Sequence, residues 1–86
     1  MKGRAGVIQS PGAMTLKRIE SGAIPIHEKT TVWVGYGKGR ACDGCGETIG
    51  QTVVEYEADV PESTRILRFH LECYTVWQQQ CEKLLA

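Results

Sequence analysis

The chain has 86 residues, and its large aromatic side chains are few: two tryptophans, three tyrosines and one phenylalanine. A chain of this size buries little apolar surface, so a metal ion or disulfides often contribute to its folding. Ten basic and ten acidic residues balance, and no stretch reaches the roughly 18 apolar residues that suggest a membrane-spanning helix. These features exclude a membrane protein and favour one small domain that a bound group helps to stabilise.

The balanced charge hides an asymmetry along the chain. Residues 1–41 hold seven basic and two acidic side chains, whereas residues 42–86 hold three basic and eight acidic ones. Either the basic half contacts an acidic partner, or the two halves neutralise each other. Lys2 and Arg4 precede no apolar run, so we expect no secretory signal. Reduced thiols without an export signal predict a cytoplasmic protein.

The N-terminal residues carry only weak structural signals. Residues 1–12 lack periodicity and contain turn-forming residues, which predicts a mobile tail. Apolar residues then recur at roughly helical spacing from Met14 to Ile19, and Gly22 can end a helix. The pattern predicts a short helix over 13–21.

Residues 30–34 are rich in β-branched and aromatic side chains and predict a strand. Three glycines then alternate with other residues over 35–39. A phosphate-binding loop is one interpretation of this stretch, but no helix N-terminus follows to present N–H groups to a phosphate. A flexible lead-in to the next segment is therefore expected.

Two pairs of metal-ligating residues dominate the sequence. Cys42 and Cys45 form a Cys-x-x-Cys pair, and His70 and Cys73 follow after 24 intervening residues. Structural zinc sites take four Cys or His ligands in a tetrahedral arrangement. His70 and Cys73 stand three residues apart, which places them on one face of a helix. The spacing predicts a Zn²⁺ site made of these four side chains.

A turn that brings Cys42 and Cys45 onto one ion requires backbone freedom, which Gly44 and Gly46 can supply through positive φ angles. Three alternatives remain: a thioredoxin-like redox pair, a disulfide framework and an iron–sulfur cluster. A redox pair needs a helix directly after Cys45, and residues 46–50 do not favour one. Zinc is the preferred interpretation.

Residues between the two ligand pairs predict a β-hairpin. The segments 52–57 and 65–69 alternate in polarity, and 59–63 has the composition of a turn. Opposite charges can pair across the two strands on a solvated face. The residues expected to pair in this way are Glu55 or Glu57 with Arg65 or Arg68.

From His70 onward the pattern is helical. Cys73, Trp77, Cys81 and Leu84 recur at three- and four-residue steps, which predicts a helix that covers the hairpin. Cys81 lies two turns beyond Cys73 and is expected to be a small buried residue. A redox or zinc-release switch that uses Cys81 is the alternative.

The order of a Cys-x-x-Cys turn (a zinc knuckle), a β-hairpin and a C-terminal helix predicts a small α+β domain. We expect this domain to be treble-clef-like and to be stabilised by zinc. We expect residues 1–30 to form a mobile basic leader and residues 31–86 to form the zinc-binding domain. A closed four-ligand site leaves no position for an activated water. The chain is therefore not expected to be an enzyme.

The ligand pattern with Phe69 before His70 resembles the first zinc unit of LIM domains, except that no second Cys pair follows Cys73. It also resembles the finger of poly(ADP-ribose) polymerase type, and the layout is similar to that of small uncharacterised bacterial zinc proteins. The polymerase-type resemblance implies recognition of DNA ends and nicks, with Arg40 touching phosphate. The residues that match this finger are Lys38, Gly39, Arg40, Ala41, Cys42, Cys45, Ile49, His70 and Cys73.

Two functions follow as hypotheses. In the first, the domain binds DNA or RNA through Lys38, Arg40 and the basic leader. In the second, it binds a protein partner through the acidic second half and its aromatic residues, Trp33, Tyr36 and Trp77. Burial of all these aromatics would argue against the second hypothesis.

Overall fold

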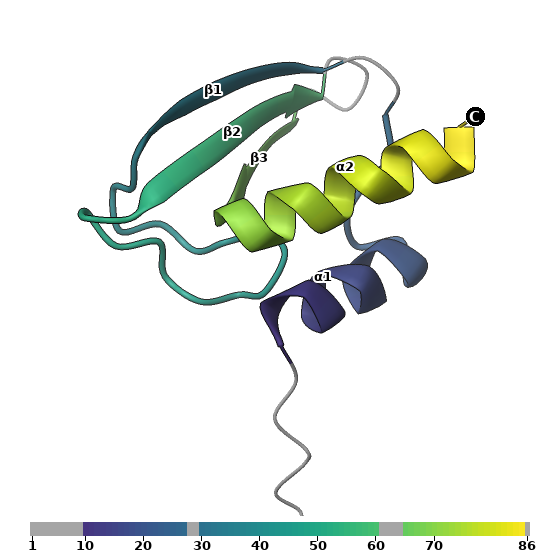
Figure 1. Ribbon diagram of the computed structural model, residues 1–86, viewed down its shortest axis with the longest axis horizontal. Helices are drawn as coiled ribbons and strands as arrows, with labels where there is room; N and C mark the ends of the chain where they lie inside the picture. Colours follow the sequence, from purple (N-terminus) through teal and green to yellow (C-terminus); the bar gives the residue numbers. More distant parts are fainter. Residues whose placement is uncertain (1–9, 28–29, 61–64, 86) are drawn as a thin grey trace, which may run out of the picture.

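The computed structural model describes residues 10–27, 30–60 and 65–85. Three antiparallel strands form one sheet, in the order β1-β2-β3. One helix crosses a face of this sheet and the other lies beside the first helix (Figure 1). The elements in chain order are α1 (Pro11–Glu20), β1 (Thr31–Tyr36), β2 (Val54–Val60), β3 (Arg65–Phe69) and α2 (Leu71–Leu85).

The predicted hairpin is present as β2 and β3. Tyr56 lies opposite Phe69 and Val60 lies opposite Arg65. Strand β2 extends to Val60, so residues 59 and 60 of the predicted turn 59–63 belong to the strand. Residues 61–63 of that turn lie outside the described residues. Strand β1 adds to the other side of β2 as a third strand, with Trp33 opposite Glu57.

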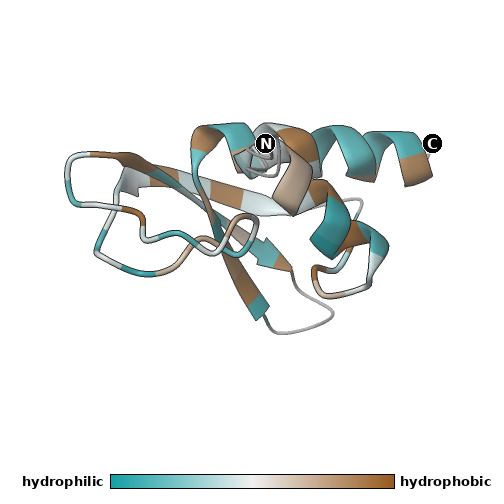
Figure 2. Ribbon diagram, turned by 90° about the horizontal axis from the view of Figure 1, so that it is seen from below, coloured by the Kyte–Doolittle hydropathy of each residue, from teal (hydrophilic) through white to brown (hydrophobic). Residues whose placement is uncertain are grey.

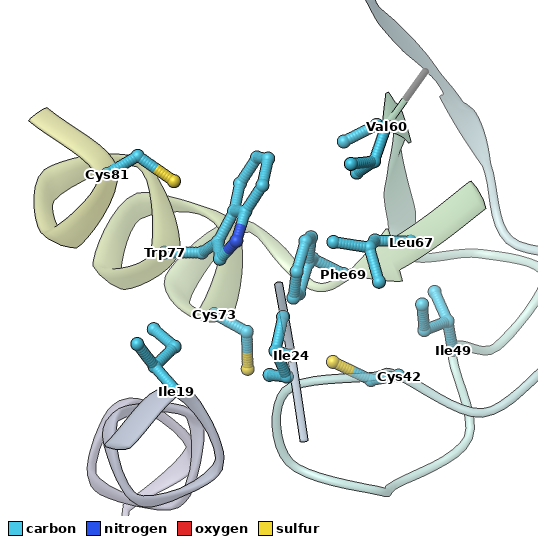
Figure 3. Packing of buried hydrophobic residues seen from close by; sticks show 11 residues of the cluster. Ile19, Ile24, Cys42, Ile49, Val60, Leu67, Phe69, Cys73, Trp77 and Cys81 are labelled. Atoms are coloured by element: carbon cyan, nitrogen blue, oxygen red, sulfur yellow. The ribbon is translucent and has the colours of Figure 1, made fainter. Parts of the chain in front are cut away.

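The apolar core lies between the sheet and the helices (Figure 3). Cys73, Trp77 and Cys81 of α2 are buried as predicted, whereas Leu84, expected on the same stripe, is 59% exposed. Hydrophobic and hydrophilic residues alternate along this helix (Figure 2). Phe69 and Trp77 stack with ring centroids 5.3 Å apart, and full burial of such side chains contributes roughly 1.5–3 kcal/mol each. The buried hydrophobic residues are Ile19, Ile24, Cys42, Ile49, Ala58, Val60, Leu67, Phe69, Cys73, Trp77 and Cys81.

Helix α1 begins two residues before the predicted start and ends one residue before the predicted end. Ser10 caps it, because the Ser10 hydroxyl accepts a hydrogen bond from the Ala13 N–H at 3.1 Å. Pro11 follows at the first helical position, where its missing N–H has no cost. These two residues belong to the stretch for which we expected a tail.

The segment around α1 packs on the rest of the protein. Ile19 and Ile24 are buried in the common core. The Trp77 Nε1–H donates to the Pro25 carbonyl at 2.9 Å, and Arg65 Nη1 donates to the Ala23 carbonyl at 3.0 Å. Residues 10–27 thus differ from the expected leader 1–30, since their apolar side chains complete a core that α2 and the sheet leave open. The expected tail over residues 1–9 lies outside the described residues.

Neither helix among the described residues is long and apolar enough to cross a membrane.

Candidate metal centre

Four side chains meet where the loop before β2, the end of β3 and the first turn of α2 come together. The sulfurs of Cys42, Cys45 and Cys73 and a ring nitrogen of His70 all lie within 4.8 Å of one another. Cys45 Sγ lies 3.4 Å from His70 Nδ1. Sulfur and nitrogen ligands about 2.3 and 2.0 Å from a tetrahedral ion lie roughly 3.6 Å apart. The four residues predicted from spacing thus form a cluster that can hold one metal ion.

The segment Cys42–Cys45, called the knuckle below, is held in a tight turn. The Cys42 N–H donates to the Glu47 carbonyl at 2.8 Å, and the Gly46 N–H donates to the Cys42 carbonyl at 2.9 Å. Gly46 has a φ of +84°, which a residue with a Cβ rarely adopts. The Gly44 N–H points at the Cys42 sulfur, 3.3 Å away. Such a hydrogen bond orients the sulfur and stabilises its anionic form.

Gly44 serves a different purpose from the one expected, since its φ is not positive. A Cβ at this position would lie 2.7 Å from the Cys73 Cβ and even closer to the Thr15 hydroxyl. The knuckle backbone therefore approaches α1 and α2 more closely than any side chain would allow. In Figure 3 the sulfurs of Cys42 and Cys73 point toward the same space.

Asp43 attaches the knuckle to β3. Its N–H donates to the Arg68 carbonyl at 2.7 Å, and its carboxylate Oδ2 accepts the Arg68 N–H at 2.8 Å. Arg65 Nη2 lies 3.5 Å from the other carboxylate oxygen. Asp43 was not among the predicted site residues, although an aspartate in a turn often bonds to nearby backbone groups. This contact fixes the knuckle against Arg68, which lies two residues before His70 in the sequence.

Helix α1 covers the metal site on the Cys73 side. Thr15 is fully buried, and its hydroxyl donates to the Pro11 carbonyl at 2.9 Å. The same carbonyl lies 3.8 Å from Cys73 Sγ. Arg18 Nη1 donates to the Asp43 carbonyl at 3.0 Å, which places a positive charge against the knuckle. Neither Thr15 nor Arg18 was predicted to have a role, because a single threonine or arginine forms no periodic pattern in the sequence.

The thiols of the cluster influence one another. A hydrogen bond from Cys73, aided by backbone groups, lowers the pKa of Cys42 to about 4. The same contact, with burial, raises the pKa of Cys73, and burial raises the pKa of Cys45. Without a cation the cluster therefore favours one anionic sulfur over three. A bound divalent ion supplies the charge that stabilises all three as thiolates.

The two residues expected to contact nucleic acid have different surroundings. Lys38 is exposed. Arg40 Nη2 lies 3.3 Å from Glu55 Oε2 and 3.6 Å from Glu57 Oε2, while Arg68 Nε lies 3.6 Å from Glu57 Oε2. The Glu57–Arg68 pair was predicted. The solvated face was wrong for Glu55, which is only 2% exposed and whose carboxylate pairs with Arg40.

The aromatic residues divide between core and surface. Trp77 is buried, whereas Trp33 is 54% and Tyr36 is 69% exposed. Val34, between them, is exposed as well. Exposed apolar side chains therefore lie on both faces of β1.

Cys81 lies outside the four-residue cluster. Its side chain is buried in the core, as predicted, and burial raises the pKa of its thiol. A protonated, buried thiol has little reactivity.

A scan against protein-family models, a search of curated proteins and a search of solved structures each find no match. The resemblances to LIM units and to polymerase-type fingers gain no support from these comparisons.

Proposed function

We propose that this protein is a structural zinc-binding module of treble-clef type. The observation that carries the proposal is the Cys₃His cluster, whose Cys45 and His70 ligand atoms already lie at the separation of two ligands on one tetrahedral ion. Three thiolates and one imidazole are a donor set that suits Zn²⁺. The ion would join the knuckle, the end of β3 and α2, and so stabilise a chain with a small core.

The proposed role of the ion is structural. Four protein ligands complete a tetrahedral shell, which leaves no position for a reacting water. Cys42 and Cys73 are buried, and α1 packs over the cluster. We therefore propose a binding module without enzymatic activity.

Metal analysis of protein purified without chelators tests this function. We expect one zinc ion per chain, and loss of the dispersed NMR spectrum after zinc removal. Cys73→Ala and Cys81→Ala form a matched pair, since both replace buried cysteines of α2. Cys73→Ala should lose stoichiometric zinc, and Cys81→Ala should retain it. Wild-type protein with no stoichiometric metal, or a spectrum unchanged by a chelator, would overturn the proposal.

We further propose that the module binds protein through the surface of β1. Trp33 and Tyr36 are exposed, and exposed aromatic side chains are enriched at protein interfaces. Arg40, by contrast, is engaged by the buried Glu55 and by Glu57, so less of its charge is available to an external phosphate.

Nucleic-acid binding is the second candidate, and the exposed position of Lys38 supports it. Fluorescence anisotropy at low salt against nicked and blunt duplexes tests it. If this candidate holds, Lys38→Ala weakens binding and raised salt weakens it further. Absence of binding at micromolar protein would remove it. Lys38 is a cleaner probe than Arg40, because loss of Arg40 also leaves Glu55 without its partner.

A further inference from the structure

The two edges of the sheet are protected differently. At β3, Asp43 bonds to both the N–H and the carbonyl of Arg68, which occupies the outward-facing backbone groups near the C-terminal end of that edge. Strand β1 pairs only with β2 among the strands that the structure describes. Figure 1 shows β1 at the outer side of the sheet. The edge of β1 is therefore the accessible one.

The ladder defines which backbone groups of β1 face outward. The Gly37 N–H donates to the Val53 carbonyl at 2.8 Å, in continuation of the β1–β2 register. Hydrogen-bonded and non-hydrogen-bonded pairs alternate along an antiparallel ladder. It follows that the N–H and carbonyl groups of Val32, Val34 and Tyr36 point away from β2.

The side chains of β1 leave this edge unprotected. Natural edge strands usually carry charges, prolines or a covering segment that blocks pairing with another chain. The sequence of β1, Thr-Val-Trp-Val-Gly-Tyr, has no charge and no proline. Three of its large side chains, Trp33, Val34 and Tyr36, are exposed.

We propose that β1 pairs antiparallel with β1 of a second copy of this chain, so that the two sheets become one. This inference rests on the proposed protein-binding function and names the partner at that surface. A strand added here has to cover Val34 and Tyr36 on one face and Trp33 on the other. A strand that is apolar on both faces meets this need, and β1 itself is such a strand.

Charge favours the antiparallel direction. Lys38 follows the Tyr36 end of β1, whereas Asp59 lies opposite Thr31 at the other end. Antiparallel pairing brings Lys38 of one copy near the end that holds Asp59 of the other. Parallel pairing would bring the two Lys38 side chains together, and like charges at close range are destabilising.

The side chains also favour one register, with the two Val34 residues opposite each other across a two-fold axis. Trp33 then lies opposite Gly35 of the second copy, and an aromatic ring over a strand glycine is a stabilising pair. Tyr36 lies opposite Val32, which is a favourable aromatic–β-branched pair. A symmetric contact of this kind closes and gives a dimer.

Sedimentation velocity of the zinc-loaded protein, from low micromolar to several hundred micromolar, tests the proposal. We expect the mass to rise toward twice that of the monomer. Val34→Lys should remain monomeric, because two lysines would face each other. Leu84→Lys is the matched control, since Leu84 on α2 is 59% exposed and Val34 is 60% exposed, and it should dimerise like the wild type. An equimolar mixture of Val34→Lys and Val34→Glu should restore association.

A second measurement requires no variant. Amide hydrogen exchange of Val32, Val34 and Tyr36 should slow as the wild-type concentration rises. Concentration-independent exchange at these amides, or a wild type that stays monomeric with one zinc per chain, would overturn the dimer and leave the zinc module standing. Absence of zinc would instead overturn the proposed function, so the two failures are distinguishable.

Discussion

Asp43 and Arg68 hold each other through two hydrogen bonds. The Asp43 N–H donates to the Arg68 carbonyl at 2.7 Å, and the Arg68 N–H donates to the Asp43 carboxylate at 2.8 Å. One residue lies in the knuckle and the other lies two positions before His70. This contact therefore aligns the two halves of the candidate metal cluster through protein groups alone, so that an ion would bind there with less rearrangement.

Asp43→Ala should destabilise the zinc-loaded protein by about 1.5–3 kcal/mol, because the Arg68 N–H loses a charged acceptor. Asp43→Asn keeps an acceptor oxygen and should lose less. Chemical denaturation measures the free energy of unfolding, and a chelator competition measures zinc affinity, which should fall in the same order. Asp59→Ala, outside this contact, is the control. Equal losses for Asp43→Ala and Asp59→Ala would contradict this role.

Gly44→Ala should destabilise the protein by about 1–3 kcal/mol, because the added Cβ would overlap Cys73 and Thr15. Gly35→Ala is the matched control, since a Cβ at Gly35 meets nothing within 4 Å and its φ is not in the positive region. Thermal unfolding of the zinc-loaded monomers compares the two. If both variants unfold at the same temperature, the close approach of the knuckle to α1 and α2 is not required.

Arg18→Ala should speed the loss of zinc to a chelator severalfold. The substitution removes the hydrogen bond to the Asp43 carbonyl and a positive charge beside the thiolates, and hydrogen bonds to charged groups contribute about 1.5–3 kcal/mol. Lys17→Ala, an exposed neighbour on α1, should leave the rate unchanged. A colorimetric chelator follows the release. Identical rates for both variants would show that Arg18 does not retain the metal.

Arg40→Ala should cost about 1–3 kcal/mol of stability, because it leaves the buried carboxylate of Glu55 without its cation. Adding Glu55→Gln to Arg40→Ala should recover part of this loss, since the neutral amide costs less to bury. A double-mutant cycle by denaturation measures the coupling between the two residues. Additive effects would mean that the ion pair contributes nothing.

The unfolding free energy should fall as the pH rises above about 9, and the fall should be smaller in Cys81→Ala. Burial raises the pKa of Cys81 above its ordinary value of 9.0. The unfolded chain then loses this proton at a lower pH than the folded protein does, so alkaline pH favours unfolding. Well below pH 9, at about pH 7 and lower, the thiol is protonated in both states and the contribution is constant. Denaturation curves from pH 8 to 10.5 compare the slopes, and equal slopes would exclude Cys81 as the cause.

Local spacing in the sequence was sufficient to predict the metal cluster and the elements that carry it. Cys42 and Cys45 had to share a turn, and His70 and Cys73 had to share a helix face. The alternation before His70 predicted the two strands between them, and the three- and four-residue steps after it predicted α2. Each of these features depends on neighbours within a few positions, so it can be predicted from local composition and periodicity.

The tertiary structure alone decided which surfaces are covered. Arg40 and Glu55 stand 15 positions apart, Asp43 and Arg68 stand 25 apart, and Pro25 lies 52 positions before its donor Trp77. No periodic pattern records such contacts. They made α1 part of the core, paired Arg40 with the buried Glu55 and left Trp33 exposed. Burial depends on what the rest of the chain brings to a surface, and a residue's own type does not specify it.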